Sequence, residues 1–204
     1  LGIAPDSRVV ALLPGSRGGE VARLGEDFAR TAAWLAARRP DLAFLAALAG
    51  PQTRASFEAT LDRCAPGVKV RIVEGRTQAV LTASDVVLVA SGTATLETLL
   101  CKRPMVVAYR LGGLTAFLLR GLKLLKAPFF AQPNLLAGRE VVPELAQGDV
   151  TPARLGEAIE RWLDSPEEVH RLEALFAELH GALRRGASEQ AADAVLALAR
   201  GGAS

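Results

Sequence analysis

The sequence predicts an α/β fold, a doubly wound parallel sheet of the Rossmann-like type with helices on both faces. Through the first 110 residues, short β-branched and aliphatic stretches alternate with stretches whose apolar residues recur every three or four positions. Strands that alternate with helices form right-handed crossovers, which make neighbouring strands parallel. Residues 85–90 (DVVLVA) are almost wholly apolar, as is typical of a strand covered on both faces.

The elements can be assigned in order along the chain. Strands are predicted over residues 8–13, 42–49, 68–73, 85–90, 104–109 and 129–136. Helices are predicted over residues 20–39, 51–64, 77–83, 93–100, 152–163, 166–183 and 188–199. Pro40 ends the first helix, while Pro51, Pro152 and Pro166 suit the first turn of theirs. We therefore expect a Rossmann-like domain over residues 1–150, followed by carboxyl-terminal helices over residues 151–204.

Composition excludes several classes of function. With 24 basic and 22 acidic residues, the net charge of +2 does not indicate a nucleic-acid partner. Cys64 and Cys101 stand far apart and outside any zinc-binding spacing, so we expect thiols in a reducing compartment. No pattern of metal ligands is present, and we expect no metal and no cofactor. No apolar run reaches the roughly 18 residues that span a membrane.

Two polar turns carry the strongest functional signal. Residues 13–20 (LPGSRGGE) and 90–97 (ASGTATLE) each follow a predicted strand and open a predicted helix. Such a turn directs unpaired backbone N–H groups and a positive helix end at one point, which suits a phosphate or diphosphate. Both turns lie at the carboxyl ends of parallel strands, where ligands bind. The pair predicts a nucleotide-sugar site.

The candidate binding residues of these turns are Ser16, Arg17, Ser91, Gly92, Thr93 and Glu97. The Arg17 guanidinium could bind two phosphate oxygens at once, and Glu97 could accept hydrogen bonds from a ribose diol. The alternative for the first turn is a plain strand–helix connection in which Ser16 caps the helix, Glu20 lies in the first helical turn and the Arg17 side chain is solvated. In the second turn, Ser91 or Thr93 could merely cap, with Glu97 complementing the helix dipole.

Three further candidates follow in residues 132–147. Asn134 offers both a donor and an acceptor, and Glu144 and Gln147 follow Pro143 at helical spacing. The alternatives are a turn closed by the Asn134 side chain and a solvated surface at the other two residues. His170 and His180 have no acid or nucleophile patterned beside them, so no catalytic base is assigned in this chain.

A basic stripe runs along the apolar residues 114–126, formed by Arg120, Lys123 and Lys126. Three interpretations remain open. The segment could be a helix packed on the core with solvated basic edges, or a helix lying on an anionic membrane surface. It could also line the mouth of a site for an acylated, phosphate-bearing substrate.

Read together, several stretches resemble the lipid-A-disaccharide synthase family in order and spacing. They are LLPGSRGGEV, ASDVVLVASGTATLE, PMVVAYR, PNLLAGREVVPEL, Gln147 and, near the end, residues 188–192 (SEQAA). PNLLAGRE is the most specific of them, although Ala-Gln precedes it where the family usually has Ser-Leu. Members of the family are longer, so the resemblance implies that this chain is the carboxyl-terminal half.

The resemblance implies one half of a GT-B glycosyltransferase, in which two Rossmann-like halves face each other and the second holds the nucleotide. The family transfers 2,3-diacylglucosamine from UDP-2,3-diacylglucosamine to 2,3-diacylglucosamine 1-phosphate. The reaction inverts the anomeric carbon without a metal and forms the β-1,6 disaccharide of lipid A. Such an enzyme would be cytoplasmic and peripheral on the inner face of the bacterial inner membrane, and a homodimer is compatible with it.

By motif, the resemblance implies UDP-sugar contacts at Arg17 and Asn134 and a diphosphate facing residues 91–93. Glu97, Glu144 and Gln147 match ribose or sugar contacts more weakly. The catalytic base is expected in the amino-terminal half. Two alternatives stay open: another UDP-sugar glycosyltransferase of the GT-B type, and a non-catalytic module for nucleotide binding or membrane docking.

Overall fold

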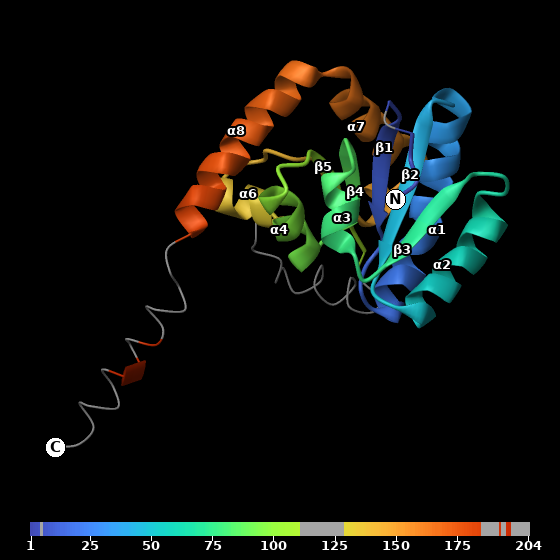
Figure 1. The fold of residues 1–204 in the computed structure, drawn as a ribbon, viewed down its shortest axis with the longest axis horizontal. Coiled ribbons are helices and arrows are strands. Elements are labelled where there is room, and N and C mark those ends of the chain that lie inside the picture. The colour runs from blue at the N-terminus through green and yellow to red at the C-terminus, as the bar shows by residue number, and fades with distance from the viewer. Residues whose placement is uncertain (5, 111–128, 185–191, 193–194, 197–204) are drawn as a thin grey trace.

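The computed structural model describes residues 1–4, 6–110, 129–184, 192 and 195–196. In this part of the chain, Figure 1 shows a single sheet between helices. The strands are β1 (Arg8–Leu13), β2 (Leu42–Leu48), β3 (Val70–Glu74), β4 (Val86–Ala90), β5 (Met105–Tyr109) and β6 (Glu144–Ala146). The helices are α1 (Gly18–Arg38), α2 (Pro51–Cys64), α3 (Thr77–Thr82), α4 (Thr93–Leu100), α6 (Gln132–Ala137), η1 (Gln147–Asp149), α7 (Pro152–Asp164) and α8 (Pro166–Leu183).

The strand order is β3-β2-β1-β4-β5-β6, with every pair parallel. In the register, Val10 of β1 lies opposite Phe44 of β2 on one side and Val86 of β4 on the other. The chain first winds outward from β1 to β3, then returns to the far side of β1 and winds the other way. Because the connections diverge between β1 and β4, a crevice is expected there at the carboxyl ends of the strands.

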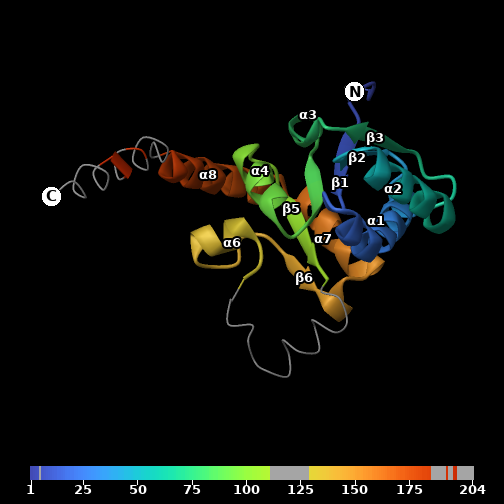
Figure 2. The ribbon, with the colours of Figure 1, turned by 90° about the horizontal axis from the view of Figure 1, so that it is seen from below.

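Helices cover both faces of the sheet, as predicted. Helices α1, α2 and α7 lie on one side of the strands, and α3 and α4 lie on the other (Figure 2). Helix α8 continues from α7 and reaches α4 and α6 (Figure 1). The predicted class, a Rossmann-like doubly wound parallel sheet followed by carboxyl-terminal helices, is confirmed.

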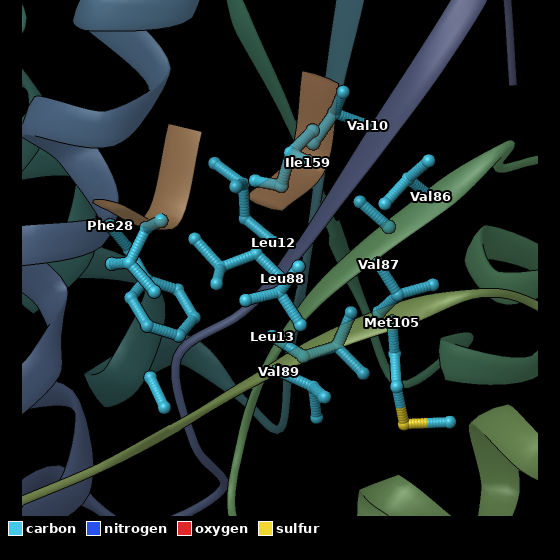
Figure 3. Close-up of a cluster of buried hydrophobic side chains, with 14 of the residues drawn as sticks. Val10, Leu12, Leu13, Phe28, Val86, Val87, Leu88, Val89, Met105 and Ile159 are labelled. Atoms are coloured by element: carbon cyan, nitrogen blue, oxygen red, sulfur yellow. The ribbon is translucent and has the colours of Figure 1, made fainter. Parts of the chain in front are cut away.

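The core sits between the central strands and the helices on each face. All five residues of β4 are buried, which explains its unbroken apolar sequence. On one face, Leu12 of β1 and Leu88 of β4 lie close to Phe28 of α1 and Ile159 of α7, all of them fully buried (Figure 3). Burying a side chain of this size contributes about 1.5–3 kcal/mol. The packing therefore ties the end of β1 to the middle of α1.

Helix α7 belongs to this core although it comes late in the sequence. Its Leu155 is fully buried, and the indole Nε1 of Trp162 donates to the Met105 carbonyl of β5 at 3.1 Å. The helix contacts α1, β4 and β5. Residues 152–164 therefore pack on the sheet formed by the first 146 residues.

Two local predictions were wrong. No strand forms over residues 129–136: from Gln132 on, the chain is the helix α6, which has Pro133 in its first turn and ends at the left-handed Gly138, whose φ is 64°. Glu144 and Gln147 are not on one helix: Glu144 begins β6, which pairs with Val107 of β5. A strand of three residues is too short to show a hydrophobic period, so pairing with β5 defines it.

Two predictions fall outside the described residues. The basic stripe of Arg120, Lys123 and Lys126 lies in residues 111–128. Most of the helix predicted over residues 188–199 is also outside the described residues, since only residues 192, 195 and 196 of it are described.

Candidate functional site

A pocket of about 320 Å³ lies at the carboxyl ends of β1 and β4, where the connections that leave these two strands diverge. It is lined by the two predicted turns together with the end of β2 and the start of α3. The lining residues are Leu13, Gly15, Ser16, Arg17, Glu20, Ala47, Leu48, Ala49, Thr77, Ala90, Ser91, Gly92, Thr93, Ala94 and Glu97. The structure thus brings together the six candidate residues of the two turns, which the sequence separates by about 75 positions.

The second turn presents backbone donors to this pocket. The N–H groups of Gly92, Thr93 and Ala94 have no acceptor among the described residues. They stand at the amino end of α4, where the helix dipole is positive. Thr95 closes the turn, because its N–H and its hydroxyl both donate to the Gly92 carbonyl, at 3.2 and 2.7 Å. Free N–H groups at a positive helix end are the arrangement that suits an anion.

The first turn is built differently, because its own helix supplies a carboxylate. Glu20 Oε2 accepts the N–H of Ser16 at 2.9 Å and the N–H of Arg17 at 3.3 Å. Arg17 Nη1 lies 3.4 Å from Glu20 Oε1. Arg17, not Ser16, is the N-cap residue, so the Ser16 cap of the plain-connection alternative is wrong, whereas its Glu20 in the first turn and its solvated Arg17 are found. The side chain of Arg17 is 84% exposed and extends into solvent at the pocket mouth.

Glu20 is a pocket residue that sequence reasoning placed only in the first turn of a helix. Its spacing carried the signal, since a glutamate three residues after the N-cap commonly accepts the N-cap N–H. Gly15 makes the fold-back possible: a Cβ added there would lie 2.4 Å from the Cβ of Glu20. Thr77 at the start of α3 was also missed, and only the meeting of β2 and α3 at this edge reveals it.

Asn134, Glu144 and Gln147 do not line the pocket. Asn134 is fully buried, and its Oδ1 accepts the N–H groups of Val141 and Val142 at 2.7 and 2.9 Å. Its Nδ2 donates to the Val142 carbonyl at 2.9 Å and to Glu144 Oε1 at 2.7 Å. These four bonds satisfy the two donors and two acceptor sites of the amide. A direct contact between Asn134 and a ligand would require some of them to break.

A partly buried ion pair lies beyond the end of β5. Arg110 Nη2 donates to Asp27 Oδ1 at 3.0 Å and to the Val150 carbonyl at 2.8 Å. Arg110 Nε lies 2.9 Å from Asp27 Oδ2 without the alignment of a hydrogen bond. Burial raises the pKa of Asp27 above its ordinary value, and Arg110 opposes the rise. The pair ties α1 to the residue that follows β5.

The family described as Lipid-A-disaccharide synthetase matches residues 1–195. The chain belongs to this family. It is 52% identical over 195 residues to lipid-A-disaccharide synthase of Alkalilimnicola ehrlichii, covering 96% of this chain and 50% of that protein. It is 50% identical over 198 residues to the synthase of Pseudomonas syringae pv. syringae, covering 97% and 50%. The chain thus spans about half the length of these relatives. The resemblance predicted from the motifs is confirmed.

Solved structures with the same fold include members of the GT-B group. The rhamnosyltransferase SpnG complexed with thymidine diphosphate superimposes with a TM-score of 0.60 and 17% identity over 88% of this chain and 43% of that chain. WaaG, a glycosyltransferase involved in lipopolysaccharide biosynthesis, superimposes with a TM-score of 0.54 and 14% identity over 91% and 45%. These identities support the fold alone. The predicted half of a GT-B fold is therefore confirmed.

The described residues contain neither a membrane-spanning helix nor a group of metal ligands. No helix among them combines the length and the hydrophobicity needed to cross a membrane. Within the same residues, no three His, Cys, Asp or Glu side chains are grouped so as to hold a metal ion.

Proposed function

We propose that this family member is the donor-binding part of a lipid-A-disaccharide synthase and holds the UDP of UDP-2,3-diacylglucosamine between β1 and β4. One observation carries the proposal: the pocket at the switch point of the sheet joins the open N–H groups of Gly92, Thr93 and Ala94 to the Arg17 guanidinium. The chain belongs to the family and spans about half the length of its relatives. Both findings support the assignment of one substrate, the UDP-sugar donor, to this part of the enzyme.

In this proposal the diphosphate occupies the amino end of α4. As the sugar is transferred, negative charge develops on the β-phosphate of the departing UDP, and donors already aimed at that place stabilise it. Arg17 adds a charge-assisted contact from the opposite wall, worth about 1.5–3 kcal/mol in a closed cleft. Glu97, exposed at the pocket edge, accepts hydrogen bonds from the ribose hydroxyls.

The remaining parts of the reaction belong to the proposal for the whole enzyme. The acceptor is 2,3-diacylglucosamine 1-phosphate, the product is the β-1,6 disaccharide, and transfer proceeds with inversion. A base that removes the acceptor proton is assigned to the amino-terminal half. Because both substrates are acylated, we place the enzyme on the cytoplasmic face of the membrane, with Arg120, Lys123 and Lys126 as candidates for contact with anionic lipid.

Calorimetric titration of the 204-residue chain with UDP tests the site. We expect saturable binding that Arg17→Ala weakens by about tenfold, since the variant loses one charge-assisted contact. Arg30→Ala is the matched control, because Arg30 is exposed on α1 and pairs with Glu26 away from the pocket. A folded chain that binds no UDP would contradict the proposal. Assays of the full-length enzyme with lipid-A precursors and with other acceptors separate it from a different UDP-sugar transferase.

A further inference from the structure

We propose that Asn134 and Glu144 shape the UDP site from outside it, by holding residues 130–132 against the turn that opens α4. The inference rests on the UDP site proposed above. Figure 2 shows the arrangement: α6 lies beside α4, and β6 lies beside β5 as the edge strand of the sheet. Neither Asn134 nor Glu144 lines the pocket, so any effect they have on a ligand must pass through the residues between.

Glu144 is bonded to three donors through two oxygens. Its Oε2 accepts the N–H of Phe130 at 2.7 Å. Its Oε1 accepts the N–H of Ala131 at 2.9 Å and the Nδ2 of Asn134 at 2.7 Å. Both terminal atoms of a carboxylate accept hydrogen bonds, whereas in a glutamine one of them is an N–H₂ donor. A glutamine here would therefore turn its N–H₂ group toward at least one N–H donor. The negative charge is thus used to hold the backbone that precedes α6.

Asn134 holds Glu144 in place and is itself held by residues 141–142. Its carbonyl oxygen accepts two backbone N–H groups there, and its amide N–H₂ is shared between the Val142 carbonyl and Glu144. The side chain is completely buried. A fully satisfied buried polar group of this kind is rigid, because every alternative orientation leaves a group unpaired.

The segment that Glu144 holds contacts the pocket wall at Ser91 and, next to it, Thr95 of the turn that opens α4. The Phe130 carbonyl accepts the Ser91 hydroxyl at 3.0 Å, and the Gln132 N–H donates to Thr95 Oγ1 at 3.3 Å. The Phe130 ring also stacks on Tyr109 at the end of β5, with centroids 4.9 Å apart. Ser91 lines the pocket, and Thr95 closes the turn whose N–H groups face it. Bonds therefore run without a gap from Asn134 to the pocket wall.

A mutant cycle on UDP affinity tests this connection. We expect Glu144→Gln to weaken UDP binding by about tenfold in the otherwise unchanged chain, because Phe130 shifts and Ser91 loses its acceptor. In a background that carries both Ser91→Ala and Thr95→Val, the same change should weaken binding by about twofold or less, because both side-chain bonds through which it acts are already absent. Glu140→Gln is the matched control, since Glu140 is an exposed glutamate in the loop between α6 and β6.

The outcomes separate this inference from the function beneath it. If the unchanged chain is folded but binds no UDP, the proposed function is wrong, and the inference that rests on it is wrong as well. If it binds UDP but Glu144→Gln has no effect, or has an equal effect in both backgrounds, the inference alone is overturned.

A second measurement needs no variant and so does not depend on one that folds. Saturating UDP should slow the amide hydrogen exchange of residues 130–132 in the unchanged chain, because the pocket wall and this segment are bonded to each other. Exchange there that UDP leaves unchanged, in a chain that binds UDP, would overturn the inference.

Discussion

The carboxylate of Glu20 folds back onto the turn that precedes its own helix, so that Oε2 accepts the Ser16 N–H at 2.9 Å. The acceptor that an incoming phosphate oxygen would supply is therefore already present at the first turn. At the second turn the corresponding N–H groups have no acceptor in the described part of the chain. The two turns look alike in sequence but make different contributions, a guanidinium from the first and backbone donors from the second.

Removing the Glu20 carboxylate should destabilise the fold. We expect Glu20→Ala to lower the free energy of unfolding by about 0.5–2 kcal/mol, the range for loss of a helix amino-terminal cap. Urea denaturation measures it. Glu26→Ala is the control, because Glu26 makes exposed ion pairs with Arg30 and Arg63 that are worth less than about 1 kcal/mol. Equal stability of the Glu20 variant and the unchanged chain would show that the fold-back is not formed in solution.

A side chain at Gly15 should be costly. Its φ is 130°, and an added Cβ would lie 2.4 Å from the Glu20 Cβ and 2.8 Å from Oε2. We expect Gly15→Ala to lower the free energy of unfolding by about 1–3 kcal/mol through backbone strain and displacement of Glu20. Gly181→Ala is the control. Gly181 lies in α8 and a Cβ added there would have no atom within 4 Å, so this change should raise the free energy of unfolding. Thermal unfolding of the two variants should therefore move in opposite directions.

Contact between α1 and α7 can be tested at Gly156. An added Cβ would lie 2.2 Å from the ring of Trp34, so Gly156→Ala should force the indole to move. Overpacking of this kind costs about 1–3 kcal/mol. Near-UV circular dichroism should report the displaced tryptophan while urea denaturation gives the loss. If stability and spectrum are both unchanged, α7 does not pack on α1 as described.

Asp27 makes a testable contribution to the pH dependence of stability. Its pKa is raised in the folded state by burial, so the folded chain holds this proton more tightly than the unfolded chain. Between the ordinary pKa of aspartate and the raised value, stability from this group is therefore lost as pH rises. Asp27→Asn does not titrate, so its stability relative to the unchanged chain should increase with pH over that window. Urea denaturation at a series of pH values measures the difference; a decrease with pH would mean that Arg110 dominates.

Most of the fold could be predicted because its signals are local. Apolar runs, prolines and the spacing of buried residues such as Val21, Leu24 and Phe28 repeat within one element and need no partner to be seen. The helix α6 could have been predicted as well, from Pro133 near its start and Gly138 just after its end. The strand β6 could not, because three residues carry no period and only pairing with β5 defines them.

By itself the sequence determined the family, the order of the strands and helices as far as β5, and the two turns that meet at the switch point. These depend on residue type and spacing along the chain, so they are readable before folding. Only the tertiary structure decided which polar groups face the pocket. Glu20 occupies the donors of one turn, and Asn134 is bonded to Glu144 and the backbone instead of facing the cavity. The reason is physical: a buried donor or acceptor must find a partner, and which partner lies within reach is a property of the folded chain.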